Sequence, residues 1–129
     1  MPFSPLGKGF FTGTVSSDAT FAPGEIRARV PRFSAENLAA NQALIDRVRT
    51  LAAARGATPA QLALAWLLAQ GPHLVPIPGT RRRERIDENN GATAVPLSAD
   101  DVAELSALVD TVGVAGDRYA EADMRRVNL

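Results

Sequence analysis

Three stretches of the chain place apolar residues at the three- to four-residue spacing of an amphipathic helix. The pattern predicts helices from Ser34 to about Arg55, from Thr58 to Gly71 and from Ser98 to Val112. The expected apolar faces are Leu38, Ile45, Val48, Leu51 and Ala52 in the first, Leu62, Ala65, Trp66 and Ala69 in the second, and Val102, Leu105, Leu108, Val109 and Val112 in the third.

The ends of these helices are marked by capping residues. Ser34, Thr58 and Ser98 each have the short hydroxyl side chain that accepts a hydrogen bond from a first-turn amide. Thr58 and Gln61 stand three residues apart, which is the spacing of a capping box. Gly56 is expected to end the first helix.

Two short apolar runs, residues 2–6 and 74–78, are predicted as strands. Both contain prolines, which lack an amide donor and therefore permit few ladder hydrogen bonds. Residues 14–33 lack periodicity and predict a long irregular loop, a feature that is often functional or flexible. A further helix is expected around residues 82–90, and the polar tail 113–129 is expected on the surface.

Composition narrows the possible functions of this 129-residue chain. The formal net charge is zero, so the whole surface offers no general field for nucleic acid or an acidic membrane. Cysteine is absent and histidine occurs once, so we expect no disulfide and no metal site. No apolar run is long enough to span a bilayer and no signal peptide is visible at Met1, so a cytoplasmic protein is expected.

The richest chemical pattern is an apolar run that leads through a Gly-Thr turn into an arginine-rich helix, residues 77–89. A phosphate favours arginine forks, hydroxyls and helix N-termini, and Thr80, Arg81 and Arg85 offer these groups. Glu88 and Asn89 follow one turn later, where a carboxylate and an amide can pair with adenine. Two alternatives remain open: a solvated helix face whose charges balance, and an RNA-binding patch, which the sparse aromatics disfavour.

This segment resembles the C-terminal cofactor signature of the aldo-keto reductases, and residues 4–10 resemble the segment that follows the seventh barrel strand in that family. The resemblance implies that residues 4–10 lie along the pyrophosphate of NADPH and that Phe3 stacks on the nicotinamide. It implies that the second segment holds the adenosine 2′-phosphate end. The cofactor-binding residues implied are Phe3, Ser4, Leu6, Gly7, Lys8, Ile77, Pro78, Gly79, Thr80, Arg81, Arg85, Glu88 and Asn89.

Gly79 departs from the pattern of the best-known branch, which has a phosphate-binding lysine at this position. Thr80, Arg81 and Arg85 are left to carry the charge, as in the branch related to potassium-channel β subunits and bacterial general reductases. NADPH is therefore the expected cofactor, with NADH as the alternative.

The resemblance also implies a fold: a (β/α)8 barrel, in which an Asp, Tyr, Lys and His tetrad comes from the earlier strands. Lys8, His73 and Tyr119 are the only residues of their kinds and match none of the tetrad positions, so no catalytic residue is assigned. The expected fold class is α/β, a C-terminal fragment of a TIM barrel, helix-rich with two short strands and unable to close a barrel alone.

We expect a single partial domain over residues 1–129. It divides into strand seven and the cofactor loop (1–13), a long loop (14–33), helices with strand eight and the cofactor helix (34–90), and a C-terminal helix with its tail (91–129).

The expected function is that of the cofactor-binding portion of an NADPH-dependent reductase of aldehydes or ketones. The carbonyl substrate is expected only in a complete enzyme, and the isolated chain is expected not to be catalytic. The rival hypothesis is a non-catalytic structural or self-assembling protein derived from this scaffold. The uncovered apolar helix faces favour a homo-oligomer. Two alternatives remain open: a fragment of a longer protein, and a small helix-rich domain in which the strands are rearranged.

Overall fold

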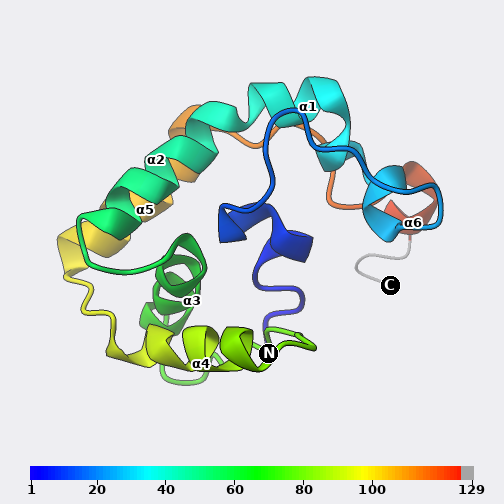
Figure 1. Cartoon of the computed structure of the whole chain (residues 1–129). Helices are drawn as coiled ribbons and strands as arrows, with labels where there is room; N and C mark the ends of the chain where they lie inside the picture. Colours follow the sequence, from blue (N-terminus) through cyan, green and yellow to red (C-terminus); the bar gives the residue numbers. More distant parts are fainter. Residues whose placement is uncertain (126–129) are drawn as a thin grey trace.

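The computed structural model describes residues 1–125, which form six α-helices connected by loops and short 3₁₀ segments (Figure 1). The α-helices are α1 (Ala35–Ala40), α2 (Gln42–Ala53), α3 (Pro59–Ala69), α4 (Arg83–Gly91), α5 (Ala99–Val112) and α6 (Glu121–Met124). The 3₁₀ segments are η1 (Gly7–Thr12), η2 (Ile26–Arg29), η3 (Pro31–Phe33) and η4 (Ala92–Ala94).

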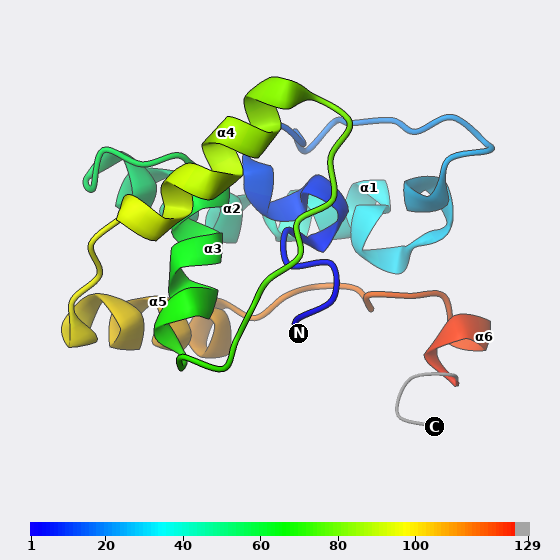
Figure 2. The same ribbon diagram turned by 90° about the horizontal axis from the view of Figure 1, so that it is seen from below.

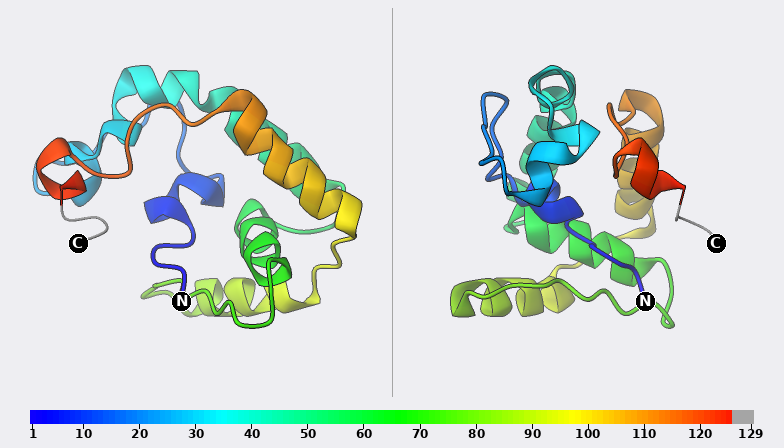
Figure 3. Two further views of the ribbon diagram at one scale, coloured as in Figure 1. Left: turned by 180° about the vertical axis from the view of Figure 1, so that it is seen from behind. Right: turned by 90° about the vertical axis from the view of Figure 1, so that its right-hand side faces the viewer.

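Helix α3 lies at the centre of the fold and contacts α2, α4, α5 and the segments η1 and η4. Helices α2 and α5 run side by side, while α4 lies across α3 (Figures 1 and 2). The N-terminal segment packs against α2 and α3 and brings Phe10 into the core (Figure 3). The largest fully buried apolar side chains are Phe10, Leu38, Leu44, Leu62 and Leu64.

The predicted helices are confirmed together with their caps. Ser34 accepts a hydrogen bond from the Asn37 amide, and Thr58 and Ser98 each form a reciprocal capping box. The predicted apolar face of residues 34–55 is buried. That helix is interrupted at Asn41, a buried residue whose side chain bonds to the C-terminal tail instead of to solvent.

The two predicted strands are not confirmed: residues 1–125 contain helices and irregular segments but no strand. A strand requires a neighbour with which to exchange backbone hydrogen bonds, and neither run has one here. Residues 2–6 fold into a turn, in which the Gly7 amide donates to the Ser4 carbonyl over 2.9 Å. Residues 74–78 are irregular, and their prolines remove further donors.

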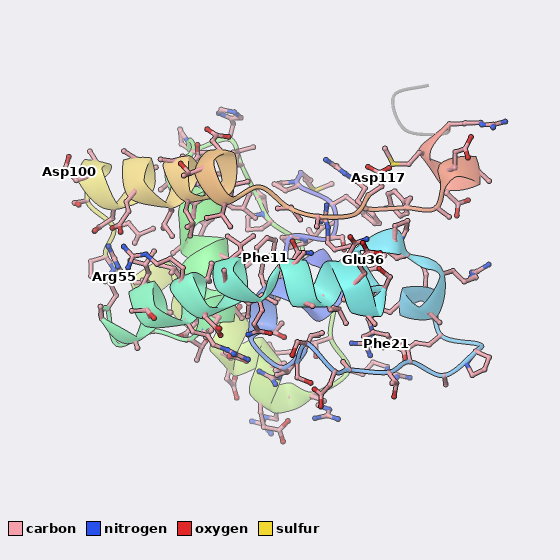
Figure 4. The ribbon with its side chains drawn as sticks, turned by 90° about the horizontal axis from the view of Figure 1, so that it is seen from above. Phe11, Phe21, Glu36, Arg55, Asp100 and Asp117 are labelled. Carbon is pink, nitrogen blue, oxygen red and sulfur yellow. The ribbon has the colours of Figure 1, made fainter. Side chains whose placement is uncertain are left out.

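The loop 14–33 is irregular until η2 and η3 begin, as the sequence predicts. The predicted surface tail passes along α1 and contains α6 (Figure 4). The last part of that prediction, residues 126–129, lies outside the described residues. Within residues 1–125, every helix is too short or too polar to cross a membrane.

Candidate functional site

An open groove of about 930 Å³ lies between the N-terminal turn and the start of α4. The chain from α3 to α4 passes beside the N-terminal segment, which brings the two sequence motifs together (Figure 2). Ten of the thirteen predicted cofactor residues line this groove: Ser4, Leu6, Lys8, Pro78, Gly79, Thr80, Arg81, Arg85, Glu88 and Asn89.

The N-terminal wall is a tight turn built on left-handed backbone. Ser4 and Lys8 have φ of 50° and 57°, which is uncommon for residues other than glycine. Gly7 and Gly9 also have positive φ, and the Gly9 amide donates to the Leu6 carbonyl over 3.0 Å. This strained backbone curls the chain tightly against the groove, a kind of conformation that clusters at binding sites.

The opposite wall is the first turn of α4. The Thr80 hydroxyl accepts a hydrogen bond from the Arg82 amide over 3.1 Å and so fixes the turn that leads into the helix. Arg85 pairs with Glu88 one turn along, with 2.5 Å between Nη1 and Oε2. The Gln61 side chain of α3 donates to the Glu88 carbonyl over 3.0 Å and holds α4 in place.

The charge of this wall is predominantly positive. Burial opposes ionisation of Glu88, but hydrogen bonds from Arg85 and Thr58 and the charge of Arg85 hold its pKa below the usual range. Glu88 therefore stays ionised and orients Arg85. Arg81 and Arg82 form no ion pair with an acid of residues 1–125, so they are available to an anion in the groove.

Three predicted residues lie apart from the groove. Phe3 is 74% exposed and lines two other cavities instead. Gly7 borders the first of those two cavities, and Ile77 is 49% exposed. Lys8 lines both the groove and the cavity that Gly7 borders, and its ammonium lies 4.3 Å from the centre of the Tyr119 ring, which lines that cavity.

Sequence reasoning missed several groove residues. Arg27 of η2 pairs with Glu25 and its guanidinium lies 4.5 Å from the centre of the Phe21 ring. Because the loop 14–33 has no periodicity, no local signal singles out Arg27. Thr12 lies two residues after the predicted cofactor segment 4–10, so extending that segment to residue 12 would have included it.

The groove offers anion-binding groups rather than metal ligands. Among residues 1–125, no three histidine, cysteine or acidic side chains come together as a metal site requires. Arginine forks, hydroxyls and strained backbone are suited to phosphates.

Comparison with known proteins shows the family of this chain. The model of the Aldo/keto reductase family matches residues 1–110. Aldo-keto reductase yakc [NADP(+)] of Schizosaccharomyces pombe is 44% identical over 117 residues, which is 91% of this chain and 34% of that protein. Probable aldo-keto reductase 1 of Glycine max is 47% identical over 92% of this chain and 34% of its own length.

A third relative, aldo-keto reductase str7 of Strobilurus tenacellus, is 37% identical over 92% of this chain and 35% of its own length. The chain thus spans about a third of the length of the relatives it matches. The match covers nearly the whole chain and includes both walls of the groove. This chain belongs to the aldo-keto reductase family.

Proposed function

We propose that this chain is the cofactor-binding portion of an NADPH-dependent aldo-keto reductase, an enzyme that reduces aldehydes or ketones. The observation that carries the proposal is the convergence of the turn at residues 4–9 with Thr80, Arg81 and Arg85 on one groove. The family membership and the NADP(+) in the name of the fission-yeast relative support it.

The residues present fit a dinucleotide with a 2′-phosphate. Arg81 faces the groove without an acidic partner among the described residues and is the natural counter-charge for that phosphate. Arg85, held by Glu88, is suited to packing against adenine. A side chain at Gly79 would meet no atom within 4 Å, so the mouth of the groove beside Thr80 is open.

We further propose that the isolated chain binds cofactor without turning over substrate. Carbonyl reduction needs a proton donor beside the hydride carrier, and the groove of the described residues is lined by no histidine or tyrosine. The rest of a complete enzyme would supply that donor.

Calorimetric titration of the 129-residue chain with NADPH tests the proposal. We expect Arg81→Ala to weaken NADPH binding about tenfold or more, because a charge-assisted hydrogen bond is worth about 1.5–3 kcal/mol. The affinity for NADH, which lacks the 2′-phosphate, should change little in the same variant. Arg83→Ala is the matched control, since Arg83 lies two residues after Arg81, at the start of α4, but does not line the groove.

Equal effects of Arg81→Ala and Arg83→Ala would contradict the assignment of the phosphate site. No binding of either cofactor at about millimolar concentration would contradict the proposed function itself. It would favour the second candidate, a non-catalytic self-assembling protein, for which the exposed apolar residues Phe3, Val75 and Ile77 are the specific observation.

A further inference from the structure

A second cavity, of about 400 Å³, lies against the same N-terminal turn as the groove. Three cations from segments remote in sequence line it: Lys8 of the turn, Arg32 of η3 and Arg118 of the tail. Aromatic rings supply much of the remaining wall, among them Phe3, Phe11 and Tyr119. A cavity of this size falls in the range of roughly 300–1,000 Å³ typical of small-molecule sites.

The tail that carries Arg118 is fastened in place by a buried amide. Asn41 is 2% exposed, donates to the Ala115 carbonyl over 2.9 Å and accepts from the Ala115 amide over 2.8 Å. Burying a polar side chain costs free energy unless the side chain forms hydrogen bonds. Both bonds of Asn41 go to a single residue of an irregular segment, which fixes the position of that segment against α1 (Figure 4).

The next residues of the tail are clamped to η3. The Arg32 amide donates to the Asp117 carbonyl and the Arg32 Nε donates to the Gly116 carbonyl, both over 3.3 Å. Gly116 has φ of +80°, and a Cβ there would lie 2.7 Å from the Arg32 amide nitrogen. Only glycine allows this approach, so the geometry that places Arg118 and Tyr119 on the cavity is specified by the sequence.

The charges of the cavity are unbalanced. Burial, with the nearby charges of Arg32 and Arg118, lowers the pKa of Lys8. Burial and Arg118 likewise lower the pKa of Arg32, while the charge of Asp117 opposes that shift. Within residues 1–125, none of the three cations forms a salt bridge. Three mutually repelling cations beside one acid form a site that an anion would stabilise.

We propose that this cavity binds the carboxylate of a small organic anion with a planar apolar body. Arg32 and Arg118 offer the fork that matches a carboxylate, and Phe3 and Phe11 offer apolar rings to the body of the ligand. In a complete reductase the anion would be a carbonyl substrate that bears a carboxylate. This last assignment rests on the proposed function, because Phe3 is the residue expected beside the nicotinamide.

The test is calorimetric titration of the 129-residue chain with 4-formylbenzoate and with its methyl ester, which has the same ring and aldehyde but no charge. We expect the acid to bind at least about tenfold more tightly than the ester, the effect of one charge-assisted hydrogen bond. Arg118→Ala should lower the affinity for the acid about tenfold and leave the ester unchanged. Arg118 is exposed and forms no salt bridge with the described acids, so the variant should fold, and a thermal melt checks this.

Arg125→Ala is the matched control, because Arg125 belongs to the same tail, pairs with Glu121 and does not line the cavity. Equal binding of acid and ester, or equal losses in Arg118→Ala and Arg125→Ala, would overturn the inference. Displacement of 4-formylbenzoate by NADPH would also overturn it, since the cations would then hold the cofactor. Binding of the acid without any binding of NADPH would contradict the proposed function alone.

Discussion

At the scale of single residues, Asp101 joins two parts of the fold. Its carboxylate accepts from the Ser98 amide over 2.9 Å, which completes the capping box of α5. It also pairs with Arg55, two residues after α2, and Arg55 in turn donates to the Leu51 carbonyl over 2.9 Å. The hydrogen bond from Arg55, then those from Ser98, lower the pKa of Asp101 to about 2.

This pKa predicts how stability depends on pH. The folded value of about 2 lies below the ordinary value of 3.8, so the stabilisation is complete above about pH 4 and is lost as the pH falls toward 2. We expect Asp101→Asn to lower the free energy of unfolding at pH 7 and to flatten its dependence on pH between about 4 and 2. Urea denaturation at several pH values measures both effects.

The neighbouring Asp100→Asn is the control, since Asp100 is exposed and makes no salt bridge with a described residue. If both variants show the same pH dependence as each other, the special role of Asp101 is refuted.

At the scale of elements, Gln61 couples two helices. Its Oε1 accepts from the Thr58 amide over 3.0 Å to cap α3, while its Nε2 donates to the Glu88 carbonyl of α4 over 3.0 Å. The two helices also come close at Gly91, where a Cβ would lie 2.5 Å from the Gln61 Nε2. The start of α3 therefore positions α4, which carries Arg85 and directly follows the turn that contains Arg81.

Gln61→Glu separates these two roles, because a glutamate keeps the acceptor of the capping box and loses the donor to Glu88. We expect the free energy of unfolding to fall by about 1 kcal/mol, since one hydrogen bond is lost and one carbonyl is left unpaired. NADPH binding should weaken as well, because α4 loses a support. Urea denaturation and calorimetry measure the two effects.

Gln70→Glu is the control at the other end of α3, where the side chain donates to the Trp66 carbonyl on an exposed surface. A Gln61→Glu chain as stable as the wild type and as tight for NADPH would show that α4 is positioned by other contacts.

The sequence predicts those elements whose stabilising contacts are local. The helix starts at Ser34, Thr58 and Ser98 are each specified within four residues, and the structure confirms them. The two predicted strands are not confirmed, because a strand depends on a partner elsewhere in the chain. The bond between Asn41 and Ala115 joins residues 74 positions apart, and no local pattern could reveal it.

The same distinction applies to the candidate site. Thr80, Arg81 and Arg85 belong to one motif and were predicted together, and the structure brings them to one groove. Arg27, Arg32 and Arg118 lie in aperiodic segments, and only the fold places them on cavities. Their role as ligands of the cofactor or of an anion stays a prediction.

At the scale of the whole molecule, the described chain leaves several large apolar side chains exposed. Val75 and Ile77 are 56% and 49% exposed, and Phe3 is more exposed still. An apolar cavity of about 260 Å³ is lined by residues of the N-terminal segment, α2, α3 and α5. The predicted apolar face of α5 is only partly covered, with Val109 40% and Val112 44% exposed.

These exposed residues predict self-association of the 129-residue chain, because large apolar side chains gain free energy when a second copy removes them from water. We expect sedimentation velocity to show a concentration-dependent shift from monomer to larger species over about 1–100 µM, the range of a weak to moderate interface. The double variant Val75→Ser/Ile77→Ser should move that shift at least about tenfold higher in concentration, because burying each side chain is worth about 1.5–3 kcal/mol.

Ile26→Ser is the control, since Ile26 is 50% exposed but belongs to the groove rather than to residues 74–78. A wild-type chain that stays monomeric throughout this range would refute self-association. A double variant that associates like the wild type would place the interface elsewhere, with the exposed face of α5 as the next surface to test. Neither Val75 nor Ile77 lines the groove, so titration of the double variant with NADPH measures cofactor binding separately from assembly.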